Sequence, residues 1–147
     1  MAATWVVLFA VGQLTVLLRG ELEVTSAYAG MGAAAIPGIL VFSFGQTALS
    51  EEILFRGFLL KRLASRFGFS RANLIQATVF GVIHLVEVLF LMDIGFLAGV
   101  VLVVYPMLAA ILLAYVNEKL SGGSILPGWL IHGCLNCLEH LLLAFSL

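Results

Sequence analysis

Charged residues are rare along this chain and divide it into long uncharged stretches. Four such stretches cover residues 2–18, 24–50, 94–117 and 120–138. A fifth, residues 72–92, is apolar apart from His84 and Glu87. A helix that crosses a bilayer needs about 20 apolar residues. The pattern therefore predicts five membrane-spanning helices, over about 2–18, 38–66, 72–92, 94–117 and 124–146.

The uncharged stretches 2–18 and 24–50 do not by themselves define the nature or the ends of the first two predicted helices. The first stretch has no basic residues before its apolar run, which favours a membrane span over a signal peptide. The stretch from residue 24 is too long for one straight crossing, and it is broken by Gly30, Gly32, Pro37 and Gly38. We therefore expect the second helix to begin near Gly38, with residues 24–37 as a re-entrant or interfacial segment.

The composition supports a membrane protein and excludes several other classes. The chain has 147 residues, of which 63% are hydrophobic and 10% are charged. Soluble domains carry about 25% charged residues, so this chain cannot cover a water-facing surface. A net charge of −1 is unsuited to a nucleic-acid binder, which needs a concentrated basic face. We predict one transmembrane domain over residues 1–147: an all-α polytopic bundle of about five helices in a lipid bilayer.

The basic residues predict how the bundle is oriented. One predicted connection contains Lys61, Arg62, Arg66 and Arg71, and Lys119 lies two crossings later on the same side. Basic residues collect in cytoplasmic connections. We therefore expect a multi-pass protein of the plasma membrane, with residues 61–71 and the N-terminus in the cytoplasm and the C-terminus outside.

Several ionisable side chains lie inside the predicted spans, where their burial is costly and suggests function. They are Glu51, Glu52, Arg56, His84, Glu87, His132, Glu139 and His140, with Asn136 as a polar neighbour. At a rise of about 1.5 Å per residue, Glu51 lies roughly 15 Å from the cytoplasmic face. His84 lies about 18 Å deep, and His132 and Asn136 about 12–18 Å deep. Three helices thus bring polar groups to one level.

Their spacing indicates different roles. Glu52 and Arg56 are four residues apart on one helical face, so we expect them to pair. Glu51 is rotated by about 100° from Glu52 and can face elsewhere as a general base. His132 and Asn136 also share a face, and both can donate hydrogen bonds to an oxyanion. His84 could orient a water together with Glu51. A water activator beside an oxyanion hole is the equipment for amide hydrolysis.

Three motifs carry a resemblance to a known family. They are E-E-x-x-x-R at residues 51–56, F-x-x-x-H at 80–84 and H-x-x-x-N at 132–136. In this order, over about residues 38–140, they resemble the CPBP family of intramembrane glutamate proteases. That family includes the CAAX prenyl endopeptidases and the bacteriocin-processing Abi relatives.

The resemblance implies a mechanism and a set of roles. Glu51 and His84 would activate water, His132 and Asn136 would hold the oxyanion, and Glu52 with Arg56 would support the site. It implies no metal or other cofactor, and a protein or peptide substrate with or without a lipid group. CAAX enzymes have about eight spans by this resemblance. This chain has only five predicted spans, which leaves open whether it assembles as a homo-oligomer.

Other interpretations remain open on the sequence alone. The Glu51–Arg56 segment could be an ion network at a helix end, His84 a core histidine bonded to a carbonyl, and His132 with Asn136 a link between helices. The corresponding functions are a non-catalytic scaffold or bacteriocin-immunity protein, an ion-coupled transporter, and a protease with zinc held by Glu51, His84 and His132.

We expect a second polar cluster near the outer side, formed by Glu87, Glu139 and His140. Phe80 is expected to pack on His84, and Cys134 and Cys137 to be buried thiols.

Overall fold

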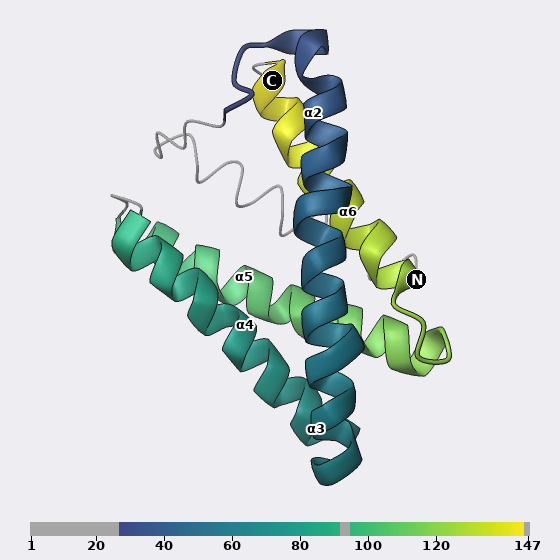
Figure 1. Cartoon of the computed structure of the whole chain (residues 1–147). Coiled ribbons are helices and arrows are strands. Elements are labelled where there is room, and N and C mark those ends of the chain that lie inside the picture. The colour runs from purple at the N-terminus through teal and green to yellow at the C-terminus, as the bar shows by residue number, and fades with distance from the viewer. Residues whose placement is uncertain (1–26, 92–94, 146–147) are drawn as a thin grey trace.

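The computed structural model describes residues 27–91 and 95–145, and that part of the chain forms helices and no strand (Figure 1). The predicted helix over residues 2–18 lies outside the described residues. Three helical stretches are long and apolar enough to cross a membrane: Gly32–Phe67, Phe69–Val86 and Gly99–Leu120. The predicted class, an all-α membrane protein, is confirmed. The total of five spans stays a prediction.

One long helix of 36 residues, Gly32–Phe67, extends through the whole molecule (Figure 1). It consists of the 3₁₀ turn η1 (Gly32–Ala35), α2 (Ile36–Leu40), the π-helical segments η2 (Val41–Leu49) and η3 (Glu52–Leu59), and α3 (Leu60–Phe67). The predicted start near Gly38 is wrong, and residues 32–37 belong to this helix. Gly32 has a φ of 56° and marks the break, whereas Pro37 lies in the first turn of α2, where proline is tolerated.

The next two helices form a hairpin against the C-terminal half of the long helix. Gly68, with a φ of 75°, reverses the chain between α3 and α4 (Phe69–Leu91). Helix α5 (Phe96–Tyr115) continues into η4 (Val116–Leu120) and lies beside α4 (Figure 1). The buried Gln76 donates hydrogen bonds to the Ala110 carbonyl at 3.2 Å and to Asn73 at 2.9 Å. Asn73 donates to the Ile111 carbonyl at 3.1 Å. These bonds fix α4 against α5.

Helix α6 (Leu126–Ala144) packs on the N-terminal half of the long helix, mainly against η2 (Figure 1). Trp129 of α6 donates a hydrogen bond to the Phe44 carbonyl at 2.8 Å, and the two rings meet edge to face. Gly133 allows this close approach, because a Cβ there would lie 2.3 Å from the Phe44 ring. Helix α6 thus packs on residues 42–44 of the long helix, and the hairpin of α4 and α5 packs on residues 55–60.

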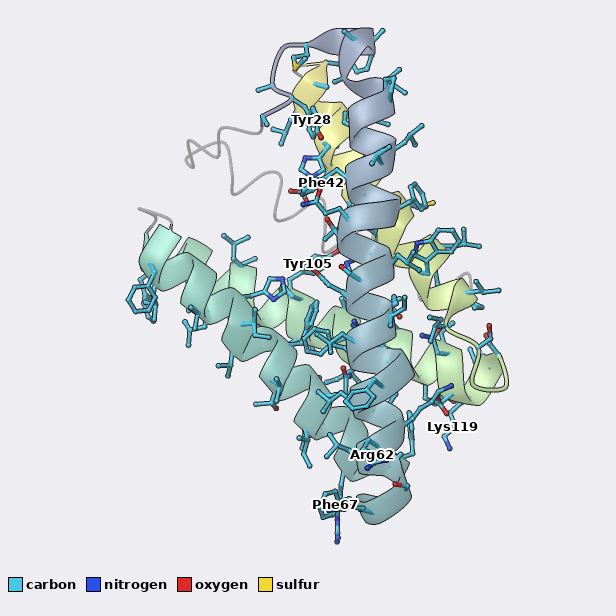
Figure 2. All side chains as sticks on the ribbon, viewed as in Figure 1. Tyr28, Phe42, Arg62, Phe67, Tyr105 and Lys119 are labelled. Carbon is cyan, nitrogen blue, oxygen red and sulfur yellow. The ribbon has the colours of Figure 1, made fainter. Side chains whose placement is uncertain are left out.

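The described basic residues outside the site gather at one end of the molecule. Arg62 and Lys119 lie at the same end in Figure 2, although they come from different parts of the chain. Lys61 donates a hydrogen bond to the Gly123 carbonyl at 2.7 Å, and the Lys119 ammonium lies over the Phe69 ring at 4.5 Å. The prediction that these segments share one side is confirmed. Their cytoplasmic placement stays a prediction.

The contact at Gly133 gives a first testable prediction. Gly133→Ala should lower the free energy of unfolding by about 1–3 kcal/mol, because the new methyl group forces the Phe44 ring away from α6. Gly45→Ala is the matched control on the partner helix, since a Cβ there meets nothing within 4 Å. Denaturant unfolding in micelles measures both variants. Equal stability of the two variants would contradict the close-packing argument.

Candidate active site

The site is built around the carboxylate of Glu52, which is fully buried in η3. Arg56, one turn later on the same helix, brings its Nη1 to 3.1 Å from Glu52 Oε1. Asn117 of η4 donates a hydrogen bond from Nδ2 to Glu52 Oε2 at 3.0 Å. The side chains of Glu52 and Arg56 are 0% and 1% exposed, so the two opposite charges compensate each other away from solvent. The predicted pairing is confirmed.

Aromatic rings extend the Arg56 environment toward α4. The Arg56 guanidinium lies over the Phe80 ring at 4.8 Å, an arrangement in which the ring face attracts the cation. Phe80 also meets Phe55 edge to face with centroids 4.8 Å apart, and it contacts the His84 ring at 4.6 Å. The expected packing of Phe80 on His84 is confirmed. Phe80 thus connects the ion pair of the long helix with the histidine of α4.

Glu51 has a different environment from its neighbour. It lies between the two π-helical segments η2 and η3, and its side chain is 27% exposed, against 0% for Glu52. Its Oε2 lies 3.7 Å from Nε2 of His132 on α6. Because the two glutamates are adjacent in sequence, they point to different faces of the helix. The prediction that Glu51 faces a different direction from Glu52 is confirmed.

His132 lies between these two carboxylates. Its Nδ1 is 3.4 Å from Glu52 Oε1, while Nε2 faces Glu51. Both Glu52 Oε1 and His132 Nδ1 are buried and form no hydrogen bond of standard geometry within the described structure. They face each other at slightly more than hydrogen-bond distance. Catalytic hydrogen bonds are often long without substrate and shorten in the reacting complex.

His84 is held by its own helix. Its Nδ1 lies 2.9 Å from the Phe80 carbonyl, so this nitrogen carries a hydrogen and donates it to that oxygen. The core-histidine interpretation is therefore correct for Nδ1. The tautomer with its only hydrogen on Nδ1 has an acceptor at Nε2, which can accept a hydrogen bond from water.

The Phe55–Phe80 contact relates His84 to Glu51. The long helix and α4 run in opposite directions (Figure 1). Glu51 precedes Phe55 by one turn and His84 follows Phe80 by one turn, so both lie on the same side of that contact. The structure therefore places His84 and Glu51 on the same side of the Phe55–Phe80 contact, and their proximity stays a prediction. Asn136 follows His132 by one turn on α6 and is half-buried, but the contacts described here do not include it.

Sequence reasoning missed two residues of this site. Asn117 looks like an ordinary polar residue at the end of an apolar helix, and its partners are distant in the chain. Gly128 looks like a small residue in a helix start, yet a Cβ there would lie 2.6 Å from the Asn117 amide and 2.7 Å from Glu52 Oε2. A buried asparagine beside a glycine of close approach has no local sequence signature.

The predicted second polar cluster is described in part. The His140 ring meets Tyr28 and Phe42 edge to face, with centroids 5.7 and 5.2 Å apart. Tyr28 and Phe42 lie toward the opposite end of the molecule from Arg62 in Figure 2. The side chain of Glu87 lies outside the described residues. Cys134 and Cys137 are half-buried thiols without a disulfide.

Within residues 27–91 and 95–145, no group of three or more His, Cys, Asp or Glu side chains could hold a metal ion. At Glu51 the arrangement offers a partly exposed carboxylate beside the Nε2 atom of His132. A carboxylate and a histidine next to each other can serve as general acid–base groups.

The helical fold and the membrane-spanning stretches define a membrane-embedded helical protein with a buried polar site. The chain matches the family model described as type II CAAX prenyl endopeptidase Rce1-like over residues 32–138, and so it belongs to that family. This confirms the family suggested by the three motifs. The family is a protease family, which makes the substrate a protein or peptide. No curated protein and no solved structure matches the chain.

The buried ion pair gives a second prediction. Arg56→Leu should lower the free energy of unfolding by about 3–5 kcal/mol, because it leaves the Glu52 carboxylate buried without its cation. Arg62→Leu removes an exposed arginine two turns further along and should leave the free energy of unfolding nearly unchanged. Denaturant unfolding in micelles compares them. A stable Arg56→Leu variant would refute the role given to this pair.

Proposed function

We propose that this chain is a glutamate-dependent intramembrane endopeptidase in which Glu51 activates the attacking water. One observation carries the proposal: two adjacent glutamates have opposite environments. Glu52 is compensated by Arg56 and Asn117, whereas Glu51 is 27% exposed and faces His132. A partly exposed carboxylate beside a histidine is better suited to accept a proton from a bound water than one that is fully buried in an ion pair.

In the proposed reaction Glu51 takes a proton from a water molecule. The resulting hydroxide forms a bond to the carbonyl carbon of the scissile peptide, and the carbonyl oxygen becomes an oxyanion. Glu51 then returns the proton to the peptide nitrogen as the C–N bond breaks, releasing an amine and a carboxylic acid, which transfer a proton between them to become an ammonium and a carboxylate. His84, whose Nδ1 donates to the Phe80 carbonyl, accepts a hydrogen of the same water at Nε2 and orients it.

His132 and Asn136 would stabilise the oxyanion. A protonated His132 can keep Nδ1 toward Glu52 and donate from Nε2, and the Asn136 amide can donate one turn further along the same face. Donors that are already in place lower the barrier most in a site away from bulk water. Glu52 and Arg56 take no part in the bond changes and hold this side of the site in position.

This proposal assigns no resident metal to the reaction. The substrate is a protein or peptide that reaches the site in the bilayer. The prenyl group in the family's name makes a prenylated C-terminal segment the first substrate to test. We place the protein in the plasma membrane with residues 61–71 on the cytoplasmic side, because basic residues gather at that end.

The third prediction tests the general base. Glu51→Gln should lower kcat by roughly 10²- to 10⁴-fold, because the amide cannot accept the proton of water. The assay follows cleavage of a fluorescence-quenched farnesylated CAAX peptide by protein in nanodiscs, with the unprenylated peptide beside it. Glu139→Gln is the matched control, a second half-buried glutamate of the bundle that the mechanism does not use.

Three results would contradict the proposal in different ways. Activity retained in Glu51→Gln would remove the general base. Loss of wild-type activity with chelators, together with bound zinc, would replace it by metal chemistry. If neither peptide is cleaved, new peptide termini in host membranes containing wild-type or Glu51→Gln protein are compared by mass spectrometry. Identical termini would contradict a protease and favour a non-catalytic scaffold.

The fourth prediction tests the oxyanion donors. Asn136→Ala should lower kcat by about 10²- to 10³-fold with little change in KM, because the lost hydrogen bond forms mainly in the transition state. Steady-state kinetics on the same peptide separates kcat from KM. A rise in KM with kcat unchanged would assign Asn136 to substrate binding instead.

A further inference from the structure

Asn117 is buried at the start of η4 and uses both ends of its side-chain amide. Its Nδ2 donates to Glu52 Oε2 at 3.0 Å, and its Oδ1 accepts the backbone N–H of Gly128 at 2.9 Å. One side chain therefore contacts the long helix and α6 simultaneously. Neither the motifs nor the mechanism above uses this residue.

The bond to Gly128 completes the first turn of α6. The first N–H groups of a helix have no partner within it and need an acceptor from elsewhere. Leu126 N–H donates to Ser124 Oγ at 3.3 Å, Pro127 has no N–H, and Gly128 N–H donates to Asn117. A Cβ on Gly128 would lie 2.6 Å from the Asn117 amide, so the α6 backbone rests directly on this side chain.

His132 follows Gly128 by one helical turn. The same amide that fixes the Gly128 backbone also fixes Glu52 Oε2, and Glu52 Oε1 then faces both Arg56 and His132 Nδ1. A shift of α6 along its axis would move His132 relative to both glutamates. Asn117 therefore contributes both to the position of α6 and to the orientation of Glu52.

We propose that Asn117 is a positioning residue of the active site, which sets His132 between Glu51 and Glu52 by bonding Glu52 and the Gly128 backbone together. This inference rests on the proposed function. It goes beyond it because it assigns a role in catalysis to a residue outside the three motifs. A residue that only stabilised the fold would affect unfolding and leave the turnover of the folded protein unchanged.

The test compares two buried asparagines. Asn117→Ala removes both bonds of the site, and Asn73→Ala removes the bond between α4 and the Ile111 carbonyl away from it. Both should lower stability. On the farnesylated CAAX peptide, Asn117→Ala should lower kcat by roughly 10- to 100-fold, because small displacements of catalytic groups are costly. Asn73→Ala should stay within about threefold of wild type, since it leaves His132 in place.

A second readout does not depend on cleavage. The ¹⁵N resonances of the His132 ring report its protonation and hydrogen bonding, with a His132→Gln variant for assignment. They should change in Asn117→Ala and remain as in wild type in Asn73→Ala. If the wild-type protein cleaves nothing but the ring responds in this way, the proposed function fails and the positioning role stands.

A reciprocal exchange provides the rescue. Asn117→Asp keeps the acceptor for Gly128 but sets one carboxylate against another, so it should lose activity. Adding Glu52→Gln allows the new amide at position 52 to donate a hydrogen bond to the new carboxylate at position 117. The bond then runs in the opposite direction from that in the wild type, and the total charge of the pair is the same. Part of the lost kcat should therefore return. Two results would overturn the inference: equal kcat and ring resonances in Asn117→Ala and Asn73→Ala, or a double variant no better than Asn117→Asp.

Discussion

The carboxylate of Glu52 is the group on which the arrangement of the helices around the site depends. A charge removed from water is tolerated only where opposite charge and hydrogen-bond donors surround it, and removing a single partner leaves a large uncompensated cost. Arg56, Asn117 and His132 supply those partners from the same helix, from η4 and from α6. The three helices that meet here must keep their relative positions for the charge to remain compensated. An apolar contact between the same helices would allow them to slide.

This arrangement also explains why two adjacent glutamates can have different chemistry. The partners of Glu52 lie on the side of the helix that faces Asn117 and the start of α6. Glu51, rotated away, faces the outer nitrogen of His132. His132 lies between the two carboxylates, so the buried carboxylate of Glu52 helps to position the ring that Glu51 faces. In the proposed mechanism, the stability of the fold and the geometry of the reaction depend on the same side chains.

The contacts between side chains within one helix were predictable from the sequence, because they follow from the spacing of the residues along the helix. Glu52 and Arg56 pair since they are one turn apart, and Phe80 packs on His84 for the same reason. Helix rise predicted Glu51, His84 and His132 at one level, and the structure brings Glu51 and His132 together. Residue spacing could not predict contacts in which a side chain of one helix meets the backbone of another helix. Asn117 and Gly128 meet because one lacks a Cβ, and the long helix begins at Gly32 because a positive φ is required there.

The long helix has a consequence for the bilayer itself. Its 36 residues extend about 54 Å, whereas a hydrocarbon core is about 30 Å thick. Helix α4, which follows it after a single glycine, has 23 residues and extends about 35 Å, close to the thickness of that core. The hydrocarbon core cannot match the long helix, so this helix must tilt or project into the headgroup layer. Such hydrophobic mismatch couples the tilt of the helix that carries Glu51 and Glu52 to membrane thickness.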